Sequence, residues 1–294
     1  MFEGFESAVV DVGDTSIFIR RGGQGPPLLL LHGFPETHLM WHRVAPLLAE
    51  RFTVVCADLR GYGSSGKPRS RSDHSPYSKR EMALDMVRVM RKQGFERFGV
   101  VGHDRGARVA YRLALDHAER VEQLAVLDII PTSDAFARAD ARFALAFWPW
   151  TLLAQPAPLP ESLIAGAPHA VVSDALSNWG SDAAAFPQEI RAAYVAALSD
   201  PASIHAICEE YRAAATLDLD LDREDRLSSR RIGCPLLVLW SAGSALDTWY
   251  QDIGGPLTLW RTWAEDVSGR PIAGGHFFPE QNAAETAAEL LQFF

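Results

Sequence analysis

This 294-residue sequence has few cysteines, no run of basic residues and no long apolar stretch, and each lack excludes a class of protein. The three cysteines, Cys56, Cys208 and Cys234, lie too far apart for a disulfide framework or a metal-binding set, so we expect a reducing, cytoplasmic location. A formal net charge of -9 argues against nucleic acid as a partner. No apolar run has the length of a membrane span, and residues 1–6 do not resemble a signal peptide, so we expect no membrane partner.

Short apolar runs and helical patterns alternate along most of the chain, whose composition of 48% hydrophobic and 22% charged residues is that of an ordinary globular protein. Runs that are apolar throughout are typical of strands buried on both faces of a parallel sheet. We predict strands at 7–11, 15–20, 27–31, 52–57, 98–101, 121–128, 235–240 and near 271–272. Helices are predicted at 41–50, 78–93, 106–117, about 256–266 and 282–293. The sequence therefore predicts an α/β fold.

The alternation stops between residues 130 and 227, where the sequence is mostly helical, rich in alanine and interrupted by prolines. We interpret this segment as an inserted helical cap (130–227), which leaves 1–129 and 228–294 as the α/β core. Ligands of such sheets bind at the carboxyl ends of the strands. We therefore expect the functional site to lie between that edge of the sheet and the cap.

The most informative segment is Gly-His-Asp-Arg-Gly at 102–106, which follows an apolar run and precedes a helical pattern. This layout is typical of a nucleophile elbow, a tight turn that lifts one side chain above the edge of the sheet. The usual residue at its centre is serine, whereas here it is Asp104. A carboxylate is already ionised at neutral pH and needs no base to activate it. We predict that Asp104 attacks carbon and forms an ester on the protein.

Four motifs occur in the order and spacing of the α/β-hydrolases: His-Gly-Phe-Pro at 32–35, Asp-Leu-Arg-Gly-Tyr-Gly-Ser-Ser at 58–65, the segment 102–106, and Gly-Gly-His-Phe at 274–277. More narrowly, the chain resembles the haloacetate (fluoroacetate) dehalogenases, relatives of the soluble epoxide hydrolases. The resemblance implies a mostly parallel central sheet with helices on both faces and an inserted lid. It also implies a hydrolase for a small anionic molecule, without metal or cofactor, and is compatible with a homodimer.

The resemblance implies that Asp104 is the nucleophile and that His276 takes a proton from the water that cleaves the ester. An acid is needed to orient the histidine, and two positions compete for this role. Asp128 ends a buried strand, where an unpaired carboxylate would be costly, and the dehalogenase resemblance also selects it. Asp247, in a polar loop after a later strand, is the alternative.

Two arginines beside the nucleophile indicate the charge of the substrate. Arg105 and Arg108 are three positions apart at a helix start, so they share a face and can both point towards Asp104. Guanidinium groups bind carboxylates with paired hydrogen bonds, which suggests a substrate that carries a carboxylate. The backbone N–H groups of Phe34 and Arg105 are predicted to form the oxyanion hole.

A departing halide needs hydrogen-bond donors, and the resemblance implies a His-Trp pair and a Tyr for this purpose. Trp150 matches the tryptophan and Tyr211 the tyrosine, but the histidine position holds Pro149, which has no donor. Trp148 or a water molecule are the alternative donors. The sequence therefore predicts impaired release of fluoride, the halide that needs donors most, while chloride and bromide release are less affected.

Two other functions remain open at this point. An epoxide hydrolase would use the same aspartate and histidine, with Tyr211 and Tyr194 as phenolic donors to the epoxide oxygen. The arginine pair weighs against this function, because a neutral epoxide gains nothing from two cations. A non-catalytic receptor on the hydrolase scaffold is disfavoured because the nucleophile, the histidine and an acid are all present.

Overall fold

The computed structural model describes the backbone of residues 1–294 and the side chains of all but residue 183. One sheet of eight strands has the order β1-β2-β4-β3-β5-β6-β7-β8. The pairs β1/β2 and β2/β4 are antiparallel, and every other pair is parallel. The strands are β1 (Glu6–Asp11), β2 (Ser16–Gly22), β3 (Pro27–Leu31), β4 (Thr53–Ala57), β5 (Phe98–His103), β6 (Val121–Leu127), β7 (Leu236–Ser241) and β8 (Val267–Ile272). The predicted mostly parallel sheet is confirmed.

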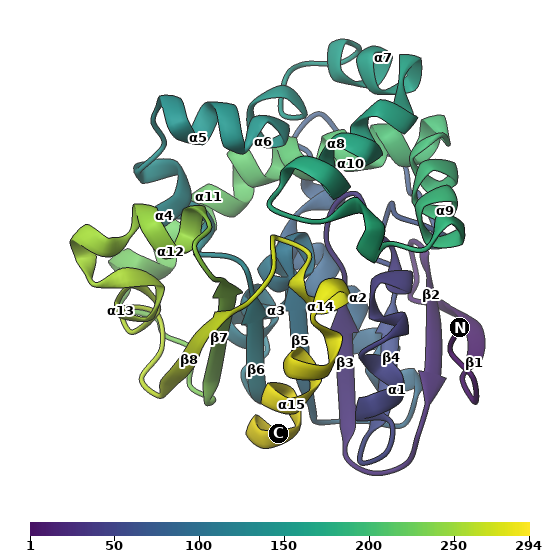
Figure 1. The fold of residues 1–294 in the computed structure, drawn as a ribbon, viewed down its shortest axis with the longest axis vertical. Coiled ribbons are helices and arrows are strands. Elements are labelled where there is room, and N and C mark those ends of the chain that lie inside the picture. Colours follow the sequence, from purple (N-terminus) through teal and green to yellow (C-terminus); the bar gives the residue numbers. More distant parts are fainter.

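Helices cover both faces of this sheet (Figure 1). The helices of the sheet layer are η1 (His38–His42), α1 (Ala45–Leu48), η2 (Ser75–Tyr77), α2 (Lys79–Lys92), α3 (Asp104–Asp116), α12 (Ala245–Trp249), η4 (Gln251–Ile253), α13 (Gly255–Trp260), α14 (Phe278–Gln281) and α15 (Ala283–Phe293). Successive residues of β3 point to opposite faces of the sheet and pack against different helices. Leu29 and Leu31 join the apolar cluster that contains α2 and α3, while Leu28 and Leu30 join the one that contains α1 and α15. A strand buried in this way needs apolar residues at every position.

The predicted helices differ from the observed ones mainly where turn residues interrupt the pattern. The helix expected at 41–50 is instead the short pair η1 and α1, with Pro46 in the first turn of α1. The helix expected at about 256–266 ends at Trp260 and starts at Gly255, which, like Gly254 before it, has a positive φ. Because these breaks depend on local turn geometry, an apolar pattern alone does not reveal them.

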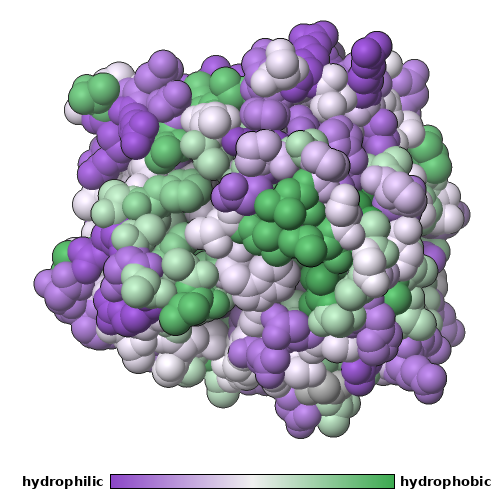
Figure 2. All heavy atoms as spheres, turned by 90° about the horizontal axis from the view of Figure 1, so that it is seen from above, coloured by the Kyte–Doolittle hydropathy of each residue, from purple (hydrophilic) through white to green (hydrophobic). Residues whose placement is uncertain are grey.

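The remaining helices lie above the carboxyl ends of the parallel strands (Figure 1). They are α4 (Thr132–Ala137), α5 (Ala141–Ala146), α6 (Trp148–Leu152), α7 (Leu159–Gly166), α8 (Pro168–Asn178), η3 (Ala183–Ala185), α9 (Gln188–Leu198), α10 (Pro201–Ala215) and α11 (Leu217–Leu227). All of them fall in the segment 130–227, for which we keep the name cap. Seen from above, this face mixes apolar and polar groups, with one apolar group near its centre (Figure 2). Among the described residues, no helix is both long enough and apolar enough to span a membrane.

Candidate active site

Asp104 lies at the junction of β5 and α3, in the turn that the sequence predicted as a nucleophile elbow. Its φ of 45° is in the left-handed region, which a non-glycine residue adopts only when the surrounding structure enforces it. Gly106 permits this turn, because a Cβ there would lie 2.5 Å from the carbonyl oxygens of Leu31 and His32. The helix begins at Asp104 itself, two residues earlier than predicted, so the nucleophile candidate occupies the first turn of α3.

The carboxylate of Asp104 is buried and held from two sides. The backbone N–H of Phe34 donates to Oδ1 at 3.0 Å, and His276 Nε2 lies 4.0 Å from Oδ2. Burial by itself raises the pKa of Asp104, but the positive charges at His276 and Arg105 outweigh it and lower this pKa to about 2. Asp104 is therefore ionised across the neutral range.

His276 lies between Asp104 and Asp128, on the loop between β8 and α14. Its Nδ1 is 2.6 Å from Asp128 Oδ2, and the other oxygen of Asp128 accepts from the backbone N–H of Ser241 at 2.8 Å. Burial lowers the pKa of His276, but the hydrogen bond and charge of Asp128 outweigh burial and raise it above its ordinary value of 6.5. Asp247, the other candidate acid, instead accepts from Trp240 Nε1 and the backbone N–H of Gly243, both at 2.8 Å.

The loop of His276 is attached to the cap through its backbone. His276 N–H donates to the carbonyl of Trp179 at 2.9 Å, and His103 Nε2 contacts the carbonyl of His276 at 2.8 Å. Gly275 permits this approach, because a Cβ there would lie 2.1 Å from the backbone of Gly180. A short backbone contact therefore joins the cap to the histidine that faces Asp104.

Arg105 and Arg108 lie behind the aromatic wall of the site. The Arg105 guanidinium is 4.0 Å from the ring centre of Tyr211, and that of Arg108 is 4.3 Å from the ring centre of Trp150. Arg105 Nε donates to both oxygens of Glu210, while Arg108 Nη1 donates to the Ile130 carbonyl and Thr132 Oγ1. Among the described residues, Arg105 Nη1 and Arg108 Nε are buried without a hydrogen-bond partner. Each arginine thus keeps one buried guanidinium N–H without a partner, although neither side chain is among those that line the cavity over Asp104.

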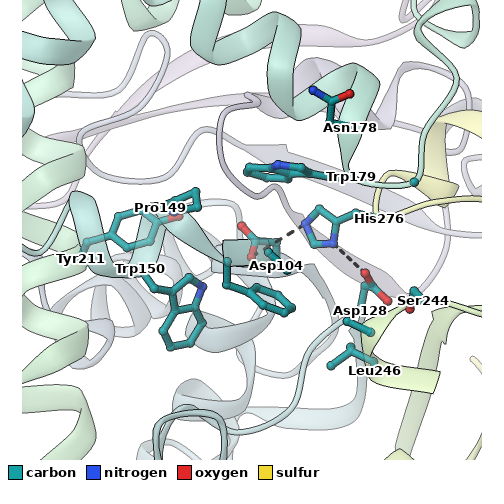
Figure 3. A pocket seen from close by; sticks show the side chains of 14 residues that line it. Asp104, Asp128, Pro149, Trp150, Asn178, Trp179, Tyr211, Ser244, Leu246 and His276 are labelled. Carbon is teal, nitrogen blue, oxygen red and sulfur yellow. Dashed lines mark hydrogen bonds and ion pairs between the residues drawn. The ribbon is translucent and has the colours of Figure 1, made fainter. Parts of the chain in front are cut away.

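A cavity of about 260 Å³ opens above Asp104 and His276 (Figure 3). Its walls are mainly apolar and aromatic, which is typical of a small-molecule site with a few polar groups. The lining residues are Asp104, Asp128, Ala146, Phe147, Pro149, Trp150, Asn178, Trp179, Gly180, Tyr211, Ser244, Ala245, Leu246 and His276. In Figure 3, Trp179 lies over Asp104 and His276, while Pro149, Trp150 and Tyr211 are grouped on the other side of Asp104.

Pro149, Trp150 and Tyr211 are the residues at which the sequence predicts the departing halide to bind. Among the described residues, neither Trp150 Nε1 nor Tyr211 Oη has a protein acceptor. Burial raises the pKa of Tyr211, so its phenol remains a donor at neutral pH. Trp148 is not a replacement for the missing histidine, because its Nε1 donates to Asp174 Oδ2 at 3.1 Å.

Sequence reasoning missed several residues of the cavity, above all Trp179. Its ring contacts His276 edge-on, with centroids 5.7 Å apart, and stacks on Phe277 at 5.8 Å. No motif marks Trp179, which directly follows the helix α8 in the cap, so only the packing of the cap on the His276 loop reveals it. Tyr194, considered as a phenolic donor, lies outside the lining and donates to Glu280 Oε1 at 3.2 Å.

Glu280 and Glu36 form a pair of buried carboxyl groups outside the cavity lining. Both side chains are fully buried, and Glu36 Oε2 lies 3.4 Å from His103 Nδ1. Burial, the larger cause, and the charge of Asp104 raise the pKa of Glu36 to about 8, and burial also raises the pKa of Glu280. At neutral pH this pair therefore holds at least one proton. Neither this pair nor any other set of His, Cys, Asp or Glu side chains among the described residues forms a group of three or more that could hold a metal ion.

Comparison with known proteins agrees with this architecture. The family described as alpha/beta hydrolase fold matches residues 26–283. A fluoroacetate dehalogenase of Burkholderia sp is 46% identical over 294 residues, which cover 100% of this chain and 95% of that protein. A soluble epoxide hydrolase of Corynebacterium sp. (strain C12) is 31% identical, with 92% of this chain and 91% of that protein covered. The crystal structure of ALR0039 from Nostoc sp PCC 7120 superposes with a TM-score of 0.96 at 49% identity, over 100% of this chain and 99% of that one. The chain belongs to the α/β-hydrolase fold family.

Proposed function

We propose that the protein is a haloacetate dehalogenase, which hydrolyses the carbon–halogen bond of 2-haloacids through an ester on Asp104. The observation that carries this proposal is an ionised aspartate at a nucleophile elbow, with unpartnered N–H groups of Arg105 and Arg108 nearby. An alkyl acceptor next to two carboxylate-binding groups favours a substrate that joins an alkyl halide to a carboxylate. The full-length similarity to a fluoroacetate dehalogenase supports the same substrate class.

In the first step, an Asp104 oxygen attacks the α-carbon of the haloacid from the side opposite the halogen. The carbon–oxygen bond forms as the carbon–halogen bond breaks, and halide leaves with the bonding electrons. Arg105 Nη1 and Arg108 Nε bind the substrate carboxylate, which holds the α-carbon in line with Asp104. Trp150 Nε1 and Tyr211 Oη donate to the departing halide. No proton is transferred in this step, since the carboxylate nucleophile is already ionised.

In the second step, water attacks the carboxyl carbon of the Asp104 ester. His276 Nε2 accepts a proton from this water, and Asp128 stabilises the resulting imidazolium through the contact at Nδ1. The N–H of Phe34 already binds an Asp104 oxygen, and with the N–H of Arg105 it stabilises the tetrahedral oxyanion. As this species collapses, the bond to the alkyl oxygen breaks, and the departing alkoxide takes the proton of the new Asp104 carboxyl group, which restores the carboxylate. His276 then loses its proton to solvent. The net products are glycolate, halide and a proton.

The direct test is to trap the ester. A His276→Asn variant incubated with chloroacetate is expected to release about one equivalent of chloride and to gain the mass of one carboxymethyl group on the peptide that contains Asp104. Asp104→Asn is the matched control, and it is expected to gain no mass and to release no chloride. An unmodified Asp104 peptide in the His276→Asn variant would refute the ester mechanism.

Epoxide hydrolysis is the second candidate, favoured by the free phenol of Tyr211 in the cavity and by the similarity to a soluble epoxide hydrolase. A second phenolic donor is lacking among the described cavity residues, because Tyr194 is bound to Glu280. Measuring chloride from chloroacetate beside diol from styrene oxide separates the two functions. Diol formation without chloride release would favour the epoxide hydrolase.

A further inference from the structure

The nucleophile candidate has two guanidinium groups near it and forms an ion pair with neither. Within the described structure, the only basic side chain within ion-pair distance of Asp104 is His276, at 4.0 Å. Opposite charges attract strongly at a buried site, where water does not screen them. An arginine that paired with Asp104 would occupy the lone pairs that attack the substrate. Some other interaction must therefore hold the arginines away.

For Arg105, that interaction is a buried carboxylate of the cap. Arg105 Nε donates to Glu210 Oε1 and Oε2 at 2.9 and 3.0 Å, and Nη2 donates to Oε1 at 2.5 Å. Both side chains are completely buried, so water does not compete for these bonds. Because the pair uses Nε and Nη2, the only unpartnered nitrogen of Arg105 is Nη1.

Glu210 is itself fixed in place. Tyr62 Oη donates to its Oε2 at 3.3 Å, and Lys79 Nζ lies against its Oε1. It belongs to α10, which also carries the cavity residue Tyr211, so one helix positions both the arginine and a donor for the halide. Arg108 is restrained differently, by the Ile130 carbonyl and Thr132 Oγ1.

We propose that Glu210 is a positioning residue that keeps the Arg105 guanidinium off Asp104, so that the nucleophile stays free while one N–H of Arg105 faces the substrate. This inference rests on the proposed function and adds a role for a residue that does not touch the substrate. Glu210 competes with Asp104 for the same cation. When Glu210 loses its charge, Arg105 turns to Asp104 and masks the attacking oxygens.

A neutral alkylating reagent tests this role, because it makes no use of carboxylate binding. In the His276→Asn background, chloroacetamide is expected to alkylate Asp104 with release of chloride, as chloroacetate does. Adding Glu210→Gln is expected to slow both reactions by about tenfold or more, since breaking one partner of a buried charge pair has a large effect. Adding Arg105→Gln to that variant is expected to restore the chloroacetamide reaction, because the masking cation is gone. If Glu210→Gln slowed the reaction only by disturbing the fold, this third substitution would not restore the rate.

The matched control is Glu209→Gln on the same helix. Glu209 is also a buried carboxylate paired with an arginine, Arg212, but it does not contact Arg105. This variant is expected to keep the rate of ester formation. A Glu210→Gln variant that reacts with chloroacetamide as fast as its parent would overturn the inference. A parent that forms no ester with either reagent would instead overturn the proposed function, and the inference with it.

A crystal structure of the Glu210→Gln variant gives a readout that is independent of any reagent. Arg105 within hydrogen-bond distance of Asp104 is the expected result, and Arg105 still directed at position 210 would refute the inference. If the single variant does not fold, the pair Lys79→Met/Glu210→Gln replaces both partners of the buried Lys79–Glu210 contact with uncharged side chains. The same position of Arg105 is expected in it.

Discussion

A histidine at position 149 is expected to increase fluoride release selectively. Pro149 lines the cavity next to Trp150 and Tyr211, the two donors proposed for the halide (Figure 3). It lies in the first turn of α6, where a proline is tolerated because the first N–H groups of a helix have no partner within it. Pro149→Ala therefore changes the backbone as Pro149→His does but supplies no donor, which makes it the matched control.

The magnitude follows from one hydrogen bond to a charged group, which contributes about 1.5–3 kcal/mol. If that bond forms with the departing halide, it lowers the barrier and raises the rate by roughly 10- to 150-fold. The gain is expected to be larger for fluoride than for chloride, because fluoride is smaller and binds donors more strongly. Trp150 and Tyr211 already serve the larger halides, so chloride release changes less.

The assay compares halide release from fluoroacetate and chloroacetate under the same conditions. The measured quantity is the ratio of the fluoride rate to the chloride rate in Pro149→His, divided by the same ratio in Pro149→Ala. This comparison cancels the greater strength of the carbon–fluorine bond. Equal ratios in the two variants, or a wild-type protein that releases fluoride and chloride at comparable rates, would refute the reasoning from Pro149.

Two further predictions concern buried carboxylates. The Asp128→Asn variant is expected to release one equivalent of chloride and then to accumulate the Asp104 ester, because hydrolysis of the ester is slowed by about 10⁴-fold. The Asp247→Asn variant is expected to keep full turnover. The opposite result in a chloride burst assay would make Asp247 the acid. Glu36→Gln is expected to raise the melting temperature by an amount that grows between about pH 4.5 and pH 8. The folded-state pKa of Glu36 is raised, so the wild type loses stability as pH rises through this window, whereas glutamine has no proton to lose. A melting-temperature difference that does not change with pH would contradict this assignment.

The sheet and the elbow could be predicted from the sequence because both depend on local patterns. Residues 27–31 are all apolar and form β3 with the predicted bounds, since a strand covered on both faces has no polar position. The Gly-x-Asp-x-Gly turn is equally local, because a Cβ on Gly102 would lie 2.4 Å from Ala107 Cα within the same turn. Both features can therefore be recognised from a few consecutive residues of the sequence.

What could not be predicted depends on contacts between distant segments. The choice between Asp128 and Asp247 stayed open because each follows a strand, and only the fold brings Ser241 N–H and His276 to Asp128. Trp179, just after the cap helix α8, and Glu210, within α10, could not be assigned a role from the sequence alone. Residues 210–213 contribute to the family resemblance, but no role for Glu210 could be predicted, because nothing near it on the chain indicates that its partner is Arg105, 105 residues away.

The bond between the His276 N–H and the Trp179 carbonyl has a consequence for the timing of the reaction. If the cap lifted away at this point, it would take this acceptor with it, and the loop that carries the base would lose its support from Gly180. Opening the pocket in this way would therefore displace His276, the proposed base. If the proposed mechanism holds, substrate entry through small side-chain movements, with the cap in place, would keep His276 in position to activate water while the ester is shielded from solvent.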